Sequence, residues 1–569
     1  MESMDIEDLF DSAPTKVTEN TTSTVGKRKI IKRAAPRKKR VVQEAEAGGV
    51  VPGTQKIYVK TQGCSHNISD GEFMMGLLAE YGYQLVDRIE ESDACLFNSC
   101  TVKNPSQDHF LFIVEKAKKM GKPVVVSGCV PQGDRNLKEL DDVSILGISQ
   151  IDRVVEVMEE TIKGNTVRLL AKKELPTLDL PKIRKNKLLE IIPLSTGCLN
   201  SCTYCKTKHA RGILGSYAPD AIISRASQAI EEGVREIWLT SEDTGAYGRD
   251  IGTSLPELVR GVLKIVPSHV MVRVGMTNPP YIKEHLDAMS DILNHPRVFG
   301  FLHIPVQSGS NPVLENMNRE YTVEEFKRVC DHLLENVPNL TIATDIICGF
   351  CYETPEQFDE TMELIDHYKF PVVNISKFYS RPGTEASKWP KVPPKEAKER
   401  STRLTHLFNK YRCYDHYQDT IQRVWIFEND DKSDATVVGH TKGYVKVLIK
   451  KQEGINLLGK QVIVKITSTH KWHITGDIIE MNPDPIEVPE DYFEKCVEAR
   501  DEKNNKLRIG FEKVEEEDTQ ESDTGIKIAR NETDKSAPLL SSFTEKMIGL
   551  GCLVVGSMML YNRLSEDLF

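Results

Sequence analysis

Apolar and polar positions alternate regularly through the first structured stretch of the chain. Short apolar runs typical of strands and amphipathic runs typical of helices follow one another at 57–60, 67–81, 94–98, 107–120 and 123–127. Strands and helices that alternate over short connections predict a parallel sheet. We therefore expect an N-terminal parallel α/β domain, Rossmann- or flavodoxin-like, over residues 56–164.

A polar, Lys-rich stretch at 165–187 predicts a linker, and the alternation then resumes. Six strand-like runs separated by helical patterns lie at 189–194, 236–240, 271–274, 299–304, 341–346 and 372–377. Repeated β/α units favour a parallel barrel whose functional residues gather at its C-terminal rim. We predict a partial β/α barrel over 188–420.

The pattern changes again near residue 421, where short β-rich runs follow one another closely. This spacing predicts a small antiparallel β-barrel over 421–482, a kind of domain often used to bind RNA. Candidate phosphate contacts, which are alternatively solvated lysines on a sheet face, are Lys442, Lys446, Lys450 and Lys451.

Both ends of the chain differ from these three domains in composition. The composition of residues 1–55 predicts a disordered tail. Met1–Pro14 lacks the apolar core of a secretory signal. Nine of the fourteen residues at 27–40 are Lys or Arg. That basic run is a solvated charge block, a nuclear address or an RNA-binding arm. Residues 483–542 are charged and poor in aromatics, which predicts a flexible acidic linker.

The overall charge and the cysteine count narrow the chemistry. A formal net charge of −10 argues against a uniformly basic coat, so any RNA contact must use local basic patches. Thirteen cysteines are too few for a disulfide scaffold in 569 residues. Clustered thiols are then better interpreted as metal ligands or redox groups.

Three cysteines lie within eight residues, directly after the first strand of the predicted barrel: Cys198, Cys202 and Cys205. Three thiolates can hold three irons of a [4Fe–4S] cube, which ordinarily takes four Cys, and they leave one iron open to another ligand. A zinc site with His209 as fourth ligand is the alternative.

Three further cysteines, Cys64, Cys100 and Cys129, each follow one of the three predicted N-terminal strands. The carboxyl ends of parallel strands share one edge of a sheet, so these thiols are expected to converge. A lone buried Cys is otherwise a small core residue, which is our interpretation of Cys95 in mid-strand.

The CxxxCxxC spacing resembles that of radical-SAM enzymes, and the N-terminal motifs resemble the methylthiotransferases among them. The matching segments, Gly63–Asn67 with Asp70 and Glu72, Asn98–Lys103 and Ser127–Cys129, belong to a resemblance that spans about 56–480 and ends in a TRAM barrel. The family implies two [4Fe–4S] clusters, one on each cysteine triad. It places S-adenosylmethionine on the open iron of the Cys198/Cys202/Cys205 cluster. Reductive cleavage of that cofactor yields a radical able to attack an unactivated C–H bond.

Rim segments of the barrel also resemble the family. The resemblance implies that the cofactor is bound by Tyr204, Ser241, Glu242, Asp243, Arg273 and Gln307, with Glu242 or Asp243 suited to its ammonium or ribose. One departure is the Cys351-Tyr352 pair, where relatives usually have Pro-Gly. Cys348 and Cys351 form a CxxC without a partner pair, so we favour packing over a third metal site.

The resemblance implies a tRNA substrate whose target adenine is splayed from the anticodon loop. It favours the eukaryotic branch that methylthiolates C2 of N6-threonylcarbamoyladenosine at position 37. N6-isopentenyladenosine, a ribosomal protein, or a catalytically idle membrane-tethered RNA-binding role are the alternatives. An electron donor and a sulfur source are required from elsewhere.

The stretch 547–561 carries no charge. It gives about 22 Å of helix at ~1.5 Å per residue, short of a ~30 Å hydrocarbon core. A start at Phe543, with Lys546 reaching the interface, lengthens it. A buried or partner-docking helix is the alternative. We predict a transmembrane tail anchor over 543–562 in the endoplasmic reticulum membrane, with the catalytic domains in the cytosol.

Overall fold

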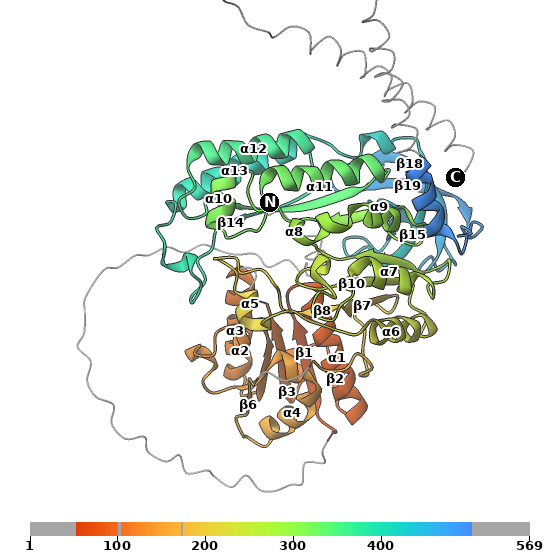
Figure 1. The fold of residues 1–569 in the computed structure, drawn as a ribbon. Coiled ribbons are helices and arrows are strands. Elements are labelled where there is room, and N and C mark those ends of the chain that lie inside the picture. The colour runs from red at the N-terminus through yellow and green to blue at the C-terminus, as the bar shows by residue number, and fades with distance from the viewer. Residues whose placement is uncertain (1–52, 101–103, 172–174, 503–569) are drawn as a thin grey trace, which may run out of the picture. The chain divides into compact units, whose positions relative to one another are not determined.

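The computed structural model describes residues 53–100, 104–171 and 175–502 (Figure 1). The chain divides into two compact units, of which the first ends at Glu490 and the second begins at Asp491. The described part of the second unit is helical from 492 to 502. Every predicted metal-ligating and cofactor-binding residue belongs to the first unit.

A six-stranded parallel sheet forms the N-terminal domain, with the strand order β2-β1-β3-β4-β5-β6. Its elements are β1 (Lys56–Thr61), α1 (Ser65–Tyr81), β2 (Gln84–Val86), β3 (Ala94–Ser99), α2 (Asn104–Lys119), β4 (Val124–Gly128), α3 (Cys129–Gly133), β5 (Ser144–Leu146), α4 (Val154–Ile162) and β6 (Arg168–Leu169). Leu96 packs with α1 and α4 on one face, and Phe97 packs with α2 on the other. The predicted parallel α/β domain is confirmed.

Part of the predicted linker at 165–187 is built into this fold. Strand β6 pairs with β5, and the buried Lys182 ammonium lies 3.3 Å from Glu72 Oε2 and 2.9 Å from Glu190 Oε1. A two-residue strand has no periodic signature, and a lysine in a polar stretch is normally solvated. For those reasons the sequence pattern indicated only a connector.

Six parallel strands form the next domain as two sheets, ordered β11-β10-β7 and β12-β13-β14. The strands are β7 (Leu189–Pro193), β10 (Glu236–Thr240), β11 (Met271–Val274), β12 (Phe301–His303), β13 (Thr341–Cys348) and β14 (Val372–Lys377). A parallel bridge between Val272 and Val298 links the two sheets. The described strands thus form an open, partial barrel.

Helices cover the outside of this partial barrel (Figure 1). They include α6 (Pro219–Glu231), α7 (Leu255–Leu263), α8 (Pro279–Ile282), α9 (Leu286–Asn294), α10 (Asn311–Asn316), α11 (Val323–Asn336), α12 (Pro355–Tyr368) and α13 (Pro394–Lys410). Helix α5 (Thr207–Arg211) instead packs against α3 of the N-terminal domain. Ser254, Thr322 and Thr354 begin three of them with capping boxes, in which side chain and backbone satisfy each other's free N–H groups. These caps fix where α7, α11 and α12 start.

A closed five-stranded barrel completes the first unit, ordered β15-β16-β17-β19-β18. Its strands are β15 (Ile421–Asn429), β16 (Thr436–His440), β17 (Lys446–Lys450), β18 (Gln461–Thr469) and β19 (Ile474–Met481). The predicted small β-barrel is confirmed, although β17 and β19 pair parallel rather than antiparallel.

This barrel is packed directly against the radical-SAM-like strands. The ring of Phe299, which is fully buried, lies 5.8 Å from that of Trp425, 6.3 Å from that of Phe427 and 4.7 Å from that of Tyr444. Such edge-to-face contacts are favourable beyond the area they bury. The two domains therefore share one hydrophobic core.

Within the described ranges, no helix has the length and apolarity needed to cross a membrane. The predicted tail anchor at 543–562 lies outside the described residues, as do residues 1–52 and most of the predicted linker at 483–542.

Candidate active site

The three N-terminal cysteines lie where three neighbouring strands end. Cys64 precedes α1, Cys100 follows β3 and Cys129 begins α3 directly after β4. Their segments approach closely, because a Cβ added to Gly63 would lie 2.3 Å from Cys100 Cβ. Gly63 also has a φ of +115°, which only glycine adopts easily. The segments of Cys64 and Cys100 therefore lie side by side, and the use of the three thiols as cluster ligands stays a prediction.

Cys100 and Cys129 are buried, and Cys64 is half-buried. Burial raises the pKa of the Cys129 thiol to about 12, while Arg211 opposes the rise and the neighbouring Cys100 thiol adds to it. Buried thiols of this kind form thiolates when a metal ion or cluster supplies the compensating positive charge.

The second triad lies on a loop after the first strand of the partial barrel. This loop is fastened to two distant segments: Thr203 donates its backbone N–H to Met317 O at 3.1 Å, and Ala386 donates to Thr203 O at 2.9 Å. Burial, followed by Asp243 and the thiols of Cys205 and Cys202, raises the pKa of Cys198 to about 12. That the three thiols of this loop hold one cluster stays a prediction.

A chain of polar contacts leads from this loop to the rim of β10. Arg319 Nη1 lies 3.0 Å from Cys202 Sγ, and Nη2 of the same guanidinium donates to Asn278 Oδ1. Asn278 Nδ2 donates to Asp243 Oδ2 at 2.9 Å. Sequence reasoning did not single out Arg319, although the Asn-Arg-Glu-Tyr segment at 318–321 follows a helix end on the same rim.

Glu242 is turned toward the N-terminal domain. Its Oε1 lies 3.0 Å from Arg211 Nε and 3.3 Å from His66 Nδ1. Arg211 also donates to Asp70 Oδ2 at 2.8 Å. Of the two acidic residues suggested for the cofactor, Glu242 is thus engaged with the N-terminal domain and Asp243 with the cysteine loop.

The remaining predicted cofactor residues occupy different positions. Ser241 Oγ accepts from Asp243 N at 2.9 Å, and the Tyr204 ring lies 5.8 Å from that of Phe350. Gln307 has a φ of +70° and donates its backbone N–H to Asp345 O. These residues share the loop-bearing rim of the barrel strands, and their contact with a cofactor stays a prediction.

Arg273 lies in a different environment. Its guanidinium carbon is 4.5 Å from the ring centroid of Trp238, 4.6 Å from that of Phe301 and 4.9 Å from that of Tyr444. Tyr444 belongs to the loop before β17 and donates its hydroxyl to Glu236 Oε1 at 3.0 Å. The structure thus places Arg273 at the junction with the β-barrel.

The prediction that Lys442 contacts a phosphate is wrong. Its ammonium donates to Leu293 O at 2.7 Å, and burial lowers its pKa to about 7. Lys450 and Lys451 are exposed and Lys446 is half-buried, so these three stay candidates.

Cysteines interpreted as packing residues are buried. Cys95 lies in the core between β3 and α2, and Cys351 packs with Phe350 and donates to Ala386 O at 3.5 Å. Tyr352, at the departure from the family pattern, has a φ of +65° and lies against Trp389 at 5.9 Å. The changed turn is therefore closed by an aromatic pair.

The segments that carry the two triads pack together. Helix α3 begins at Cys129, and a Cβ added to its Gly133 would lie 3.5 Å from Lys206 Cε and from Ala210 Cβ. Lys206 directly follows Cys205, so a segment of each triad lies at this contact.

The described side chains form no compact ligand set for a single metal ion. Among the described His, Cys, Asp and Glu side chains, no three converge on one point as a zinc site requires, and this includes the suggested Cys and His209 set. Each thiolate of a [4Fe–4S] cube binds its own iron, so its ligands surround the cluster instead.

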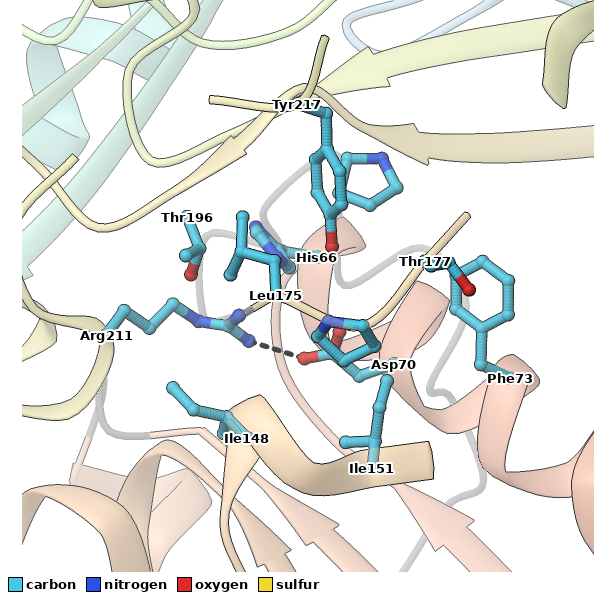
Figure 2. Close-up of a pocket in the computed structure, with 12 residues that line it drawn as sticks. His66, Asp70, Phe73, Ile148, Ile151, Leu175, Thr177, Thr196, Arg211 and Tyr217 are labelled. Carbon is cyan, nitrogen blue, oxygen red and sulfur yellow. Dashed lines mark hydrogen bonds and ion pairs between the residues drawn. The ribbon is translucent and has the colours of Figure 1, made fainter. Parts of the chain in front are cut away.

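A small hollow lies between the N-terminal domain and the barrel, beside the Asp70–Arg211 pair (Figure 2). Its volume of ≈ 20 Å³ has room for about one water molecule. The lining residues are His66, Asp70, Phe73, Ile148, Ile151, Leu175, Pro176, Thr177, Pro193, Thr196, Arg211 and Tyr217.

Residues 192–365 match the Radical SAM superfamily, and residues 56–147 match Uncharacterized protein family UPF0004. The partial barrel and its CxxxCxxC loop accordingly define a radical-SAM enzyme, a class that uses S-adenosylmethionine and a [4Fe–4S] cluster.

Similar proteins narrow the class. A Xenopus laevis protein named threonylcarbamoyladenosine tRNA methylthiotransferase is 51% identical over 84% of this chain and 86% of its own length. A Pyrococcus horikoshii protein, named as a probable enzyme of the same kind, is 38% identical over 69% and 93%. This chain belongs to the threonylcarbamoyladenosine tRNA methylthiotransferase family. The structure of the radical S-adenosylmethionine methyltransferase TsrM from Kitasatospora setae is 12% identical over 59% of this chain and 75% of that one, at a TM-score of 0.43.

Proposed function

We propose that this protein replaces the C2 hydrogen of N6-threonylcarbamoyladenosine at position 37 of tRNA with a methylthio group. The observation that carries the proposal is the contact between the segments of Cys129 and Cys205, in a family whose relatives bear that substrate in their names. An aromatic C2–H bond resists acid–base chemistry, which is why radical chemistry is needed.

We assign the Cys198/Cys202/Cys205 triad to the radical-SAM cluster and the Cys64/Cys100/Cys129 triad to a second [4Fe–4S] cluster. When bound, the Cys198/Cys202/Cys205 cluster would supply the electron that cleaves S-adenosylmethionine. The Cys64/Cys100/Cys129 cluster would supply a site for the sulfur to be transferred. The protein's own residues hold these sites in place: Arg319 contacts Cys202, and Asp243 is fixed by Asn278. A reductant and a sulfur source come from other molecules.

The substrate would be held through the β-barrel. Exposed Lys450 and Lys451 and half-buried Lys446 are candidate contacts for tRNA phosphates. The shared core at Phe299 supports a fixed relation between RNA-binding barrel and active site. The target base would leave its stack to reach the rim.

Nucleoside mass spectrometry on two tRNAs tests the proposal. The anaerobically reconstituted protein is incubated with tRNA carrying N6-threonylcarbamoyladenosine or N6-isopentenyladenosine, with Cys100→Ala and Cys202→Ala as matched inactive variants. We expect the methylthio mass on the threonylcarbamoyl nucleoside alone, and only with wild type. Product on the isopentenyl nucleoside would show that the substrate assignment is wrong. No methylthio product on either nucleoside would overturn the proposal.

We also propose that residues 543–562 anchor the protein in the endoplasmic reticulum membrane with its catalytic domains in the cytosol. The support is the uncharged run at 547–561 after a charged segment. Membrane flotation of the full chain against a chain ending at 542 tests this. Equal flotation of the two proteins would contradict it.

A further inference from the structure

One fully buried side chain contacts all three segments that carry the N-terminal triad. Asn67 Nδ2 donates to Gln62 O at 3.2 Å, just before Cys64, and to Ser99 O at 3.0 Å, just before Cys100. Its Oδ1 accepts from Cys129 Sγ at 3.6 Å. No other single group described above reaches the three strand ends together, so the amide of Asn67 is the centre of the triad's scaffold.

The same amide oxygen is held by a residue from the other triad's domain. Arg211 ends α5, six positions after Cys205, and its Nη2 donates to Asn67 Oδ1 at 2.7 Å. This guanidinium also contacts Asp70 on α1, Glu242 after β10 and the Cys129 thiol. One side chain thus joins the N-terminal scaffold to the rim of the barrel.

A buried guanidinium is a costly way to join two domains. Its side chain is only 2% exposed, so it has lost most of its hydration, and the two carboxylates offset that loss without making the arrangement a strong source of stability. What the planar fork provides is direction, because its donors point along fixed lines to several oxygens at once. The arrangement therefore favours a role in geometry.

We propose that Asn67 and Arg211 are positioning residues that set the separation and orientation of the Cys64/Cys100/Cys129 triad relative to the Cys198/Cys202/Cys205 loop. The inference rests on the proposed function, in which both triads serve one reaction. Transfer between two sites depends steeply on geometry, and a displacement of about 1 Å can cost on the order of 100-fold in rate. Cleavage of S-adenosylmethionine needs only the Cys198/Cys202/Cys205 triad and does not depend on Asn67 or Arg211.

Two substitutions of Arg211 separate geometry from folding. Arg211→Lys keeps the positive charge beside Asp70 and Glu242, but one ammonium cannot reproduce the fork. Arg211→Gln removes the charge, and the adjoining hollow has room for about one water molecule that can solvate the carboxylates (Figure 2). Asn67→Asp keeps the shape and loses the donors to Gln62 and Ser99. Arg249→Gln, which removes a more exposed pair with Glu284, is the matched control.

The readouts are iron per chain, the ratio of methylthio product to 5′-deoxyadenosine, and the magnetic interaction between the two reduced clusters by electron paramagnetic resonance. We expect full iron and normal 5′-deoxyadenosine in both Arg211 variants, with the product ratio at least about tenfold lower in Arg211→Gln and an intermediate fall in Arg211→Lys. The control matches wild type. In Asn67→Asp, we expect selective loss of the iron held by the Cys64/Cys100/Cys129 triad.

A product ratio and a magnetic interaction equal to wild type in both Arg211 variants would overturn the inference. So would a parallel loss of all iron in Arg211→Lys, because that result indicates a role in folding only. If wild type made no methylthio product on any tRNA, the proposed function would fail, yet the magnetic interaction would still test the positioning role.

Discussion

Arg319 and Cys202 are 117 positions apart in the sequence, and the guanidinium Nη1 lies 3.0 Å from the cysteine Sγ. The same guanidinium donates to Asn278, which holds Asp243. A single cation thus connects a proposed cluster ligand to the acidic residue on the neighbouring rim. Hydrogen bonds to cluster sulfur are among the factors that set its reduction potential.

Replacing Arg319 with Met is expected to lower the midpoint potential of the radical-SAM cluster. Loss of a donor destabilises the reduced, more negative state, and a shift of about 60 mV corresponds to a tenfold change for one electron. Redox titration in the Cys100→Ala background follows this cluster alone, with Arg319→Lys as the charge-conserving control. An unchanged potential in Arg319→Met would show that the contact is absent in the loaded enzyme.

Glu190→Gln is expected to destabilise the first unit by about 3–5 kcal/mol, because it leaves buried cations without their partner. The carboxylate is fully buried and pairs with Lys182, Arg184 and Arg225. Denaturant unfolding measures the loss. Glu156→Gln, from an exposed pair with Arg153, should stay within about 0.5 kcal/mol of wild type.

The same residue predicts a pH dependence. Burial opposes the charge on Glu190, but Lys182, Arg225 and Arg184 together lower its pKa from 4.5 to about 2. A depressed folded-state pKa contributes stability above the unfolded value and loses it as pH falls. The stability difference between wild type and Glu190→Gln should therefore shrink from pH 4.5 toward pH 2. A constant difference across that window would be inconsistent with a charged Glu190.

Phe299→Ala is expected to cost about 3–5 kcal/mol and to loosen both domains that share its ring contacts. In Phe299→Ala, limited proteolysis should release the β-barrel and cleave the partial barrel at the same protease concentration. Ile421→Ala, at a position 61% exposed on β15, is the control and should change little. Release of the β-barrel with no effect on the partial barrel would argue against a shared core.

Neutralising Lys450 and Lys451 should weaken tRNA binding and reduce its dependence on salt. Each lost phosphate contact lowers the slope of log affinity against log salt by about 0.7–0.9. Binding measured across a salt series gives this slope. A slope equal to wild type in the double Ala variant would remove these lysines from the interface.

Local pattern was enough to predict the architecture and to place three cysteines at neighbouring strand ends. Cys64, Cys100 and Cys129 follow strands that are parallel neighbours, and this placement required only strand ends and sheet direction. The CxxxCxxC spacing indicated a cluster or a zinc site, and the family resemblance favoured the cluster. The β-rich runs after residue 421 likewise predicted a small barrel before any contact was known.

Pairings between distant polar residues could not be predicted in this way. Arg211 meets Asn67 across 144 positions, and nothing in either local segment indicates it. The family resemblance placed Arg273 among the cofactor-binding rim residues. The aromatic rings around it instead come from β10, β12 and the loop before β17. Lys442 has the composition of a phosphate contact, and only tertiary packing directs it to Leu293.

The central claim is that two separate cysteine triads each carry a cluster and that both are required for methylthiolation. Iron and acid-labile sulfide are therefore counted in anaerobically reconstituted wild type, Cys100→Ala and Cys202→Ala, and each sample is assayed on threonylcarbamoylated tRNA. The account predicts about eight irons per chain in wild type and about four in each variant, with product from wild type alone. About four irons in wild type, unchanged in Cys100→Ala, would contradict it.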